Sequence, residues 1–414
     1  MAIVTLPPTP VPVRSTAVAG AGWVTVGSLL ANVAAYLLHL PASRWLGPDG
    51  YGSFASLLSV QLVLAVPALA IQAVVAREVV RGRAVHELRR SARDTALAVA
   101  VLSLVVAPLA AMALHTTVLG ALAAALTAPL LVVLSGELGL LQGRAAFRLL
   151  AVALAGMALL RVTPAVVVLA EGAGPTAALV AGAAGTLVAA LGVRRLAGGA
   201  PTADGPPTGT RWRALVGVLR ASQVQLVLIV LTSVDLLMAR ALLGDNDSGL
   251  YALGAVAAKA AFWLPQAVGV VLYPQLADPV QRGRALRTAV AVLAGVGAVV
   301  VAGAALAAPL VPVLVGSAYS GVTGVLWLFA LQGAALTVLQ SALLSAVARD
   351  RTRVAAMAWV GLVVEVGLLT LVHGSVTQVV AMAAAVAVVL AALTTVRELG
   401  RSTVPADPSR AATP

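Results

Sequence analysis

Two basic side chains stand out because they interrupt long apolar runs of the sequence. Lys259, the only lysine, lies in the run 250–272, and Arg161 lies in the run 149–170. An ionisable side chain inside an apolar segment of membrane-spanning length is costly and is a functional candidate by default. We expect Lys259 to contact a pyrophosphate or another anionic group, or else to pair with a buried acid or with helix carbonyls. Arg161 can bind phosphate oxygens through two parallel hydrogen bonds, and a structural pair with Glu137 is the alternative.

Acidic side chains in apolar runs point to gating or to ion binding. Asp235 and Arg240 lie near the end of the run 214–238, where we expect an interfacial brace or gate rather than contact with a substrate. Glu365, in the run 354–373, is the isolated acid best suited to take up a proton or a sodium ion. Hydrogen bonding within its own helix bundle is the alternative for Glu365.

Amides and prolines form a third group of candidates. Amide side chains inside the runs could bind sugar hydroxyls or, more commonly, hydrogen-bond neighbouring helices: Asn32, Gln61, Gln72 and Gln266. Pro67 and Pro265 occupy matching places in the two halves of the chain. Because proline breaks the helical hydrogen-bond ladder, both positions predict kinks about which a helix could bend.

The remaining polar residues do not form a catalytic pattern. The chain has no cysteine, and no metal-ligand spacing connects its four histidines, His39, His86, His115 and His373. The glycine-rich stretch RWLGPDGYGSFASLL, residues 44–58, lacks the preceding strand and the lysine of a phosphate-binding loop. We therefore expect no enzyme activity, no metal site and no bound cofactor, and we expect 44–58 to be a turn between two apolar segments.

The composition identifies the elements that must position these side chains. The 414 residues are 61% hydrophobic and 10% charged, whereas soluble domains carry about 25% charged residues. Apolar runs of about 20 residues, the length needed to cross a bilayer, recur along the whole chain. Only helices and closed barrels span lipid, and the runs are continuous rather than alternating, so they predict helices. The chain is predicted to be an all-α polytopic membrane protein with an uncleaved first span.

Polar breaks divide the apolar residues into about twelve predicted spans. The first half contains runs 19–41, 52–76, 94–115, 117–141, 149–170 and 177–193. The second half contains runs 214–238, 250–272, 289–308, 321–348, 354–373 and 377–396.

Arginines gather in alternate connections between the runs. The connection 77–93 carries six of them, Arg77, Arg81, Arg83, Arg89, Arg90 and Arg93. Short cytoplasmic loops hold the excess of basic residues, so both termini are predicted to be cytoplasmic. We expect these clusters, which produce a net charge of +12, to set topology and contact anionic lipid rather than to bind nucleic acid.

A polar stretch rich in Pro, Gly and Thr divides the spans six and six. We expect residues 197–213 to be a flexible cytoplasmic linker between an N-terminal lobe, 1–196, and a C-terminal lobe, 214–396. Residues 397–414 are predicted to be a disordered cytoplasmic tail.

The two halves carry related turn sequences. RWLGPDGYGSFA (44–55) resembles RALLGDNDSGLYA (240–252), and His39 and Asp235 each precede the shared arginine by five residues. Both stretches lie between an odd and an even span. The halves therefore share one membrane orientation, as parallel repeats do.

Several short motifs carry a resemblance to a known family. They are Leu46-Gly47-Pro48, Tyr51-Gly52, Val234-Asp235, Gly249-x-Tyr251-Ala252, Tyr273-Pro274 and Ala348-Arg349. Nearly the whole chain resembles the polysaccharide-export flippases of the multidrug/oligosaccharidyl-lipid/polysaccharide (MOP) exporter superfamily, and the motifs come in the same order. The resemblance implies two six-helix lobes with spans one, two, seven and eight facing a central cleft, and span five outside it. Leu236 departs from the basic residue that family members often have there, so the partner of Asp235 stays open.

The resemblance implies a transporter of the bacterial cytoplasmic membrane that flips a lipid-linked oligosaccharide, carried on polyprenyl pyrophosphate, by alternating access. Glycosyltransferases and a polymerase of cell-surface polysaccharide synthesis are the expected partners. Coupling to a proton gradient, a sodium gradient or the membrane potential is left open. An ion-coupled multidrug or small-molecule antiporter is the alternative. A membrane glycosyltransferase or ligase is disfavoured because the predicted extracytoplasmic loops are short, and a degenerate flippase acting as a scaffold is a further alternative.

Overall fold

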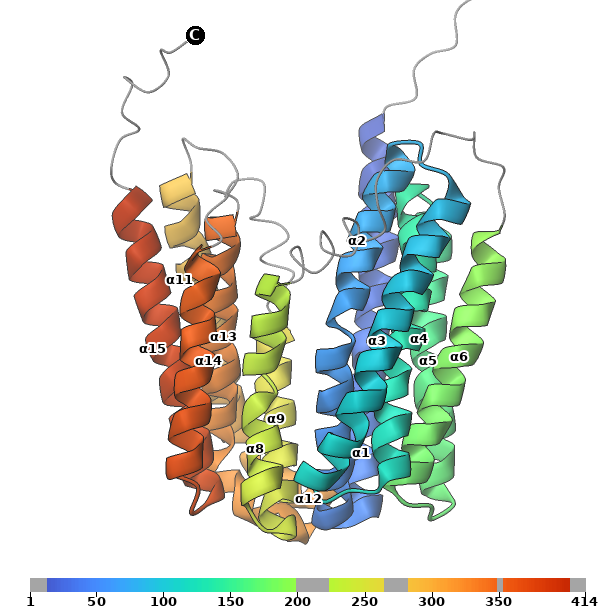
Figure 1. Ribbon diagram of the computed structural model, residues 1–414. Coiled ribbons are helices and arrows are strands. Elements are labelled where there is room, and N and C mark those ends of the chain that lie inside the picture. Colours follow the sequence, from blue (N-terminus) through green and yellow to red (C-terminus); the bar gives the residue numbers. More distant parts are fainter. Residues whose placement is uncertain (1–12, 199–222, 264–281, 348–352, 403–414) are drawn as a thin grey trace, which may run out of the picture.

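The computed structural model describes residues 13–198, 223–263, 282–347 and 353–402, and helices form nearly all of these ranges. The helices stand side by side in two groups, one for each half of the chain (Figure 1). Each of the predicted spans falls on a helix or on the described part of one. The all-α, two-lobed architecture predicted from the sequence is therefore confirmed. The predicted linker lies almost entirely outside the described residues, as do Pro265, Gln266 and residues 403–414 of the predicted tail. The prediction of disorder is wrong for residues 397–402, which form the end of α15 (Val376–Ser402).

The N-terminal lobe consists of α1 (Val13–Leu64), α2 (Val66–Val80), α3 (Val85–Ala113), α4 (Val118–Gly143), α5 (Phe147–Ala170) and α6 (Pro175–Ala197). The described part of the C-terminal lobe starts at Gln223, with a turn at 232–233 before α8 (Val234–Leu242). It continues with α9 (Asp245–Trp263), α11 (Arg282–Ala307), α13 (Leu326–Val347), α14 (Arg353–Leu371) and α15 (Val376–Ser402).

Helix α1 contains two arms that run in opposite directions. Its 52 residues would extend about 78 Å as a straight helix, far more than one bilayer crossing. Gly47 breaks the helix with φ 66° and ψ 178°, a backbone conformation open to glycine but not to residues with a side chain. The second arm breaks again at Ala65, and Pro67 follows in the first turn of α2. The kink predicted at Pro67 is confirmed.

The lobes differ between their third and fourth helices. In the N-terminal lobe, residues 114–117 connect α3 directly to α4. In the C-terminal lobe, the same connection is a strap, residues 308–325, which contains η1 (Ala308–Leu310), α12 (Val311–Val315) and η2 (Ser317–Val325). The strap packs against α1 of the opposite lobe (Figure 1).

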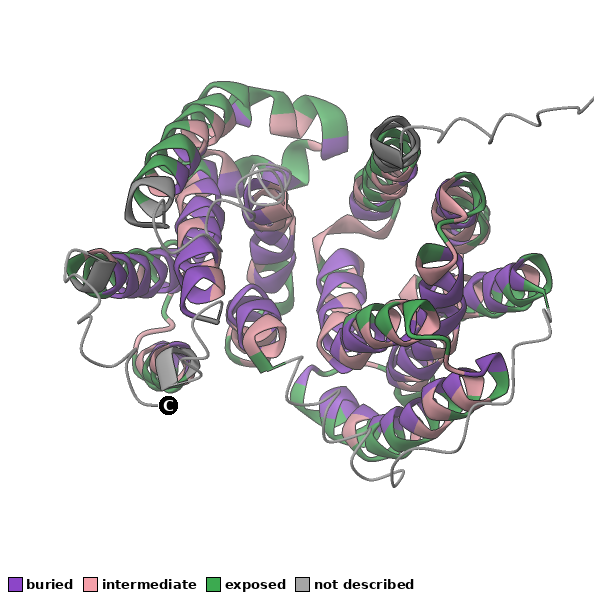
Figure 2. Cartoon of the chain, turned by 90° about the horizontal axis from the view of Figure 1, so that it is seen from above, coloured by how far each residue is buried: buried purple, intermediate pink, exposed green. Residues whose placement is uncertain are grey.

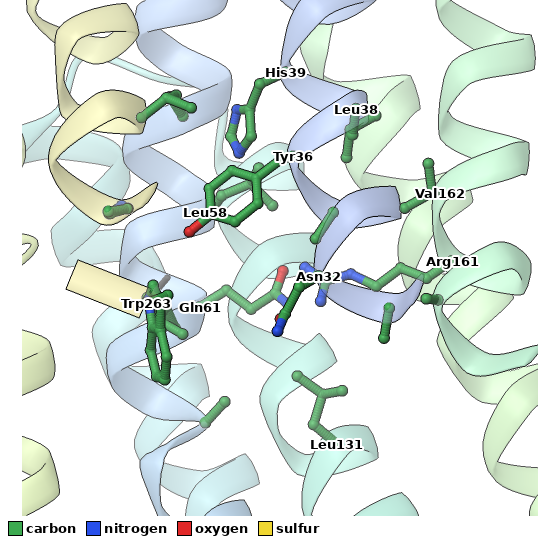
Figure 3. A pocket seen from close by; sticks show the side chains of 18 of the residues that line it. Asn32, Tyr36, Leu38, His39, Leu58, Gln61, Leu131, Arg161, Val162 and Trp263 are labelled. Atoms are coloured by element: carbon green, nitrogen blue, oxygen red, sulfur yellow. The ribbon is translucent and has the colours of Figure 1, made fainter. Parts of the chain in front are cut away.

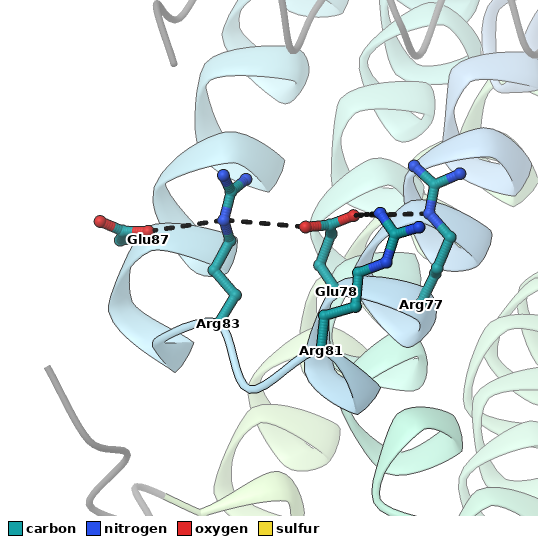
Figure 4. Close-up of polar contacts among 5 residues, drawn as sticks. All are labelled: Arg77, Glu78, Arg81, Arg83 and Glu87. Carbon is teal, nitrogen blue, oxygen red and sulfur yellow. Dashed lines mark hydrogen bonds and ion pairs between the residues drawn. The ribbon is translucent and has the colours of Figure 1, made fainter. Parts of the chain in front are cut away.

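The two ends of the bundle differ in charge. We call the end that carries Gly47 and the residues 240–252 the turn end, and the end that carries the arginine-rich connection 77–93 the basic end. At the basic end, Glu78 and Glu87 lie among Arg77, Arg81 and Arg83, with ion pairs of 3.0–3.8 Å (Figure 4). These groups are partly exposed, so each pair adds at most about 1 kcal/mol to stability.

The flanks of the bundle are apolar. Buried residues face the interior of each lobe and exposed ones lie on its outside (Figure 2). Large exposed side chains include Val80, Val101, Leu306 and Leu371. Within the described ranges, nine helical stretches are long and apolar enough to cross a membrane. The chain is a multi-pass membrane protein.

Candidate functional site

A cavity of about 320 Å³ lies between the lobes. Both arms of α1 form one wall, together with residues of α4, α5 and α6, and α8 and α9 close it from the C-terminal lobe. The volume falls within the range of small-molecule sites. Most of the lining is apolar, and its polar or aromatic members are Asn32, Tyr36, His39, Gln61, Arg161, Thr186, Lys259 and Trp263 (Figure 3).

The two basic residues predicted to bind an anion both line this cavity. Lys259 donates from Nζ to Ser59 Oγ, 2.7 Å away on the opposite lobe, and Asp235 attracts it electrostatically. Arg161 extends from α5 into the cavity (Figure 3). The expectation that span five lies outside the cleft is therefore wrong. No acidic side chain among the described residues lines the cavity.

The alternative pairing of Arg161 with Glu137 is also wrong. Glu137 accepts two hydrogen bonds from Arg89, each 2.9 Å long, at Nε and Nη2. This two-pronged geometry is the strong form of an arginine–carboxylate pair. Arg89 also donates to the Gly198 carbonyl, 3.0 Å away, at the end of α6. Both carboxylate oxygens of Glu137 thus accept hydrogen bonds from Arg89 of α3, and Arg161 faces the cavity instead.

The predicted amides separate into two groups. Asn32 and Gln61 line the cavity and lie near one another in it (Figure 3). Gln72 instead donates to Gln142 Oε1, 3.1 Å away, and so bridges α2 and α4.

Four polar or aromatic cavity residues were not predicted as site residues. Tyr36, His39, Thr186 and Trp263 all line it. His39 had a sequence signal, since it precedes the repeated turn at the same distance as Asp235 does. The other three are moderately polar residues in long apolar runs, and which face of the helix they occupy depends on packing.

Asp235 and Glu365 are two of the buried acids of the C-terminal lobe. Asp235 Oδ2 accepts hydrogen bonds from Tyr251 Oη at 2.8 Å and from Gln332 Nε2 at 3.0 Å. Glu365 is 2% exposed, and its charge and that of Asp235 act on one another. Asp235 Oδ1 and Glu365 Oε1 have no hydrogen-bond partner among the described residues. A buried unpaired carboxylate oxygen is unfavourable, so this pair is suited to take up a cation or a proton.

Arg240 holds the two lobes together at the turn end. It is 4% exposed and donates from Nε to the Leu114 carbonyl, 3.0 Å away, at the end of α3. Its Nη1 donates to Ser248 Oγ and pairs with Asp245 Oδ1, both at 2.8 Å. The geometry fits the predicted brace, and Asp235 takes no part in it.

The strap adds further contacts between the lobes at this end. Tyr319 Oη donates to the Ser43 carbonyl, 3.0 Å away, and the Tyr319 ring meets Tyr51 edge-on at 6.3 Å between centroids. Arg44 donates to the Leu314 carbonyl over 3.4 Å.

The repeated turns themselves meet at the same place. A Cβ atom on Gly249 would collide with the Pro48 carbonyl, and one on Gly52 would lie 3.0 Å from Ser248 Oγ. The two related turn sequences thus form a close backbone contact between the lobes at the turn end.

The sequence matches no family model and no curated protein. The fold does match solved structures. One is a multidrug resistance MATE family transporter of the MOP superfamily in an inward-facing conformation, with a TM-score of 0.74, 14% identity and coverage of 91% of this chain and 94% of that one. Another is the lipid II flippase MurJ in an inward closed conformation, with a TM-score of 0.66, 10% identity and coverage of 91% and 90%.

The chain has the MATE fold. An outward-facing MATE family structure of the same superfamily matches with a TM-score of 0.54, 14% identity and coverage of 93% and 95%.

Proposed function

We propose that the chain is a MOP-superfamily transporter that flips a lipid-linked oligosaccharide or a similar anionic amphiphile across a membrane. The observation that carries the proposal is the cavity lining, in which Lys259 and Arg161 supply positive charge and no described acidic residue opposes it. Guanidinium and ammonium groups suit phosphate oxygens. Asn32 and Gln61 add amides that can hydrogen-bond sugar hydroxyls. The fold likeness to a lipid II flippase agrees with this substrate class.

The mechanism follows from the closed turn end. Arg240, the strap and the two turns hold the lobes together there. If the arginine-rich basic end is cytoplasmic, as basic loops favour, the present state admits substrate from the cytoplasm. Opening of the turn end would then release the headgroup on the other side, while the lipid tail stays in the bilayer. The nearer likeness to an inward-facing structure supports this assignment.

Asp235 and Glu365 are proposed to couple the cycle to a proton or sodium gradient. They are buried, lie within electrostatic range of each other and have unpaired carboxylate oxygens. Asp235 also attracts Lys259 in the cavity wall. Neutralising Asp235 would weaken that attraction, which links this acid to the substrate site.

The proposed setting is the cytoplasmic membrane of a bacterium, with both termini inside. There the chain would work with glycosyltransferases and a polymerase that make and consume the lipid-linked oligosaccharide. An ion-coupled multidrug antiporter is the second candidate, favoured by the likeness to multidrug transporters. A cation exporter needs carboxylates toward its substrate, and the described cavity lining has none.

Ligand selectivity separates the two candidates. Purified protein in detergent is titrated with farnesyl pyrophosphate and with a cationic dye of similar size, and binding is measured by calorimetry. The flippase proposal predicts binding of the pyrophosphate, weakened at least tenfold by Lys259→Ala or Arg161→Ala. Arg148→Ala is the matched control, because Arg148 lies on the same helix, α5, over the Trp23 ring and outside the cavity lining. Preferential binding of the cationic dye would favour the antiporter.

A further inference from the structure

We propose that His39 supplies a third, directional hydrogen bond to the anionic headgroup, from Nε2–H. This inference rests on the proposed function, because it concerns the same cavity. His39 is a cavity-lining residue on the first arm of α1, three positions after Tyr36. Its ring hangs into the space above Tyr36 and Gln61 in Figure 3.

The two ring nitrogens of His39 have different surroundings. Nδ1 lies 2.9 Å from the hydroxyl of Tyr51, on the second arm of α1. Nε2 makes no hydrogen bond with the described residues, so it is the nitrogen left for a ligand. Lys259 and Arg161 both act electrostatically on this ring. His39 therefore lies where the fields of the two cavity cations overlap.

The Tyr51 hydroxyl determines which nitrogen carries the proton. Tyr51 is fully buried, and a buried O–H group needs an acceptor. Nδ1 of His39 is the acceptor that the described residues offer it. If Tyr51 donates to Nδ1, the neutral ring carries its proton on Nε2. The hydrogen-bond network thus assigns a donor, not an acceptor, to the cavity side of His39.

A neutral donor contributes something that the two cations do not. Lys259 and Arg161 attract any anion, but their long side chains can follow it over several positions. His39 has a short side chain, and Tyr51 fixes its ring. Its Nε2–H would therefore select a phosphate oxygen at one place in the cavity. This difference assigns His39 to positioning and specificity, and the cations to overall affinity.

The orientation of His39 also depends on the closed turn end. The Tyr51 ring packs edge-on against His39 at 6.0 Å and against Tyr319 of the strap at 6.3 Å. Tyr319 is held in turn by its bond to the Ser43 carbonyl. Tyr51 thus connects the cavity to the contact that must open during transport. Separation of the strap would loosen the His39 donor at the step in which the headgroup leaves.

Two amide substitutions separate binding from bracing. In His39→Asn the side-chain amide lies where Nδ1 of the histidine lay. Its oxygen can accept the hydrogen bond from Tyr51, but the shorter side chain has no group that reaches the ligand. In His39→Gln the amide nitrogen lies where Nε2 of the histidine lay, so a donor toward the cavity is kept. The hydrogen bond to the Tyr51 hydroxyl is lost. Both variants are made in the full chain, purified in detergent and titrated with farnesyl pyrophosphate, with melting temperature as the test of folding.

The proposal predicts that His39→Asn weakens binding about tenfold, the loss expected for one hydrogen bond to a charged group, and that His39→Gln stays within about threefold of wild type. Tyr51→Phe, which keeps the ring packing and removes the hydroxyl, should weaken binding by about threefold because the Nε2–H tautomer is no longer fixed. This variant also keeps the test decisive if His39→Asn does not fold.

Contrary results are distinguishable. If Lys259→Ala abolishes binding but His39→Asn and Tyr51→Phe bind like wild type, the role of His39 is wrong and the proposed function stands. A larger loss in His39→Gln than in His39→Asn identifies His39 as a brace for Tyr51 and likewise overturns the inference. If the wild-type protein does not bind the pyrophosphate, both the inference and the proposed function are wrong.

Discussion

The two lobes place their charged residues differently. The N-terminal lobe pairs its buried acid, Glu137, with Arg89 through two hydrogen bonds and turns Arg161 toward the cavity. The C-terminal lobe keeps two acids, Asp235 and Glu365, inside its own bundle, with oxygens that have no partner among the described residues. Glu137 is thus compensated by a direct basic partner, whereas Asp235 and Glu365 each keep an oxygen without one among the described residues.

This difference suggests a division of roles. A buried carboxylate that is paired with a basic side chain serves the structure. A buried carboxylate without such a partner can instead bind a proton or a cation. We infer that the N-terminal lobe provides most of the binding wall and that the C-terminal lobe provides energy coupling. The strap, which the N-terminal lobe lacks, joins the two across the turn end.

The largest effect is expected where the lobes meet. Gly249→Val places side-chain atoms against the Pro48 carbonyl, so the turn end cannot close and transport should fall below a tenth of wild type. The chain has no native cysteine, so a single introduced cysteine can report closure of the turn end. Ser43→Cys is suitable because Ser43 is fully buried and its carbonyl accepts the hydrogen bond from Tyr319 of the strap. Its labelling by a water-soluble maleimide should rise strongly in Gly249→Val.

Gly244→Ala is the matched control for that variant. Gly244 lies in the same turn, and a Cβ there would meet nothing within 4 Å. Unchanged Ser43→Cys labelling in Gly249→Val would show that the contact between the turns is not the closing contact.

The next effect tests the difference between the buried acids. Glu365→Gln and Asp235→Asn remove charges that form no ion pair with a basic side chain in the described part of the chain. We expect gradient-driven flipping in proteoliposomes to fall about tenfold, while binding of farnesyl pyrophosphate in detergent stays within about threefold.

Glu137→Gln should lower stability and leave the gradient dependence of flipping intact. It leaves Arg89, which is largely buried, without its carboxylate, and breaking such a pair costs about 3 kcal/mol. The melting temperature should drop, whereas the dependence of flipping on the gradient should be retained. If Glu137→Gln abolished the gradient dependence as Glu365→Gln does, the division between the lobes would be wrong.

The smallest effect concerns the brace at the turn end. Arg240→Ala removes hydrogen bonds from a buried guanidinium to the Leu114 carbonyl and Ser248, and should lower the free energy of unfolding by about 2 kcal/mol. Arg44→Ala removes a longer, exposed contact with the Leu314 carbonyl and should change it by less than about 0.5 kcal/mol. Thermal unfolding of both variants in one detergent makes the comparison, and equal shifts would contradict the assignment of Arg240 as the main brace.

The membrane helices could be predicted because hydropathy is a local property of the chain. The kink at Pro67 follows from proline chemistry and was also predictable. The pairing of Glu137 with Arg89 was not, because it depends on how α3, α4 and α6 are rotated about their axes. The same holds for Arg161, whose helix was expected outside the cleft. His39 has a sequence signal, but its role depends on Tyr51, which the turn at Gly47 brings back beside it.

The central claim is that positive charge in the cavity moves an anionic lipid-linked headgroup between leaflets. The most direct measurement is flipping of a fluorescent polyprenyl-pyrophosphate oligosaccharide in proteoliposomes. Wild-type protein and Arg148→Ala should flip it at similar rates, and Lys259→Ala together with Arg161→Ala should reduce the rate to that of empty liposomes. Flipping at the wild-type rate by the doubly substituted protein would contradict the account.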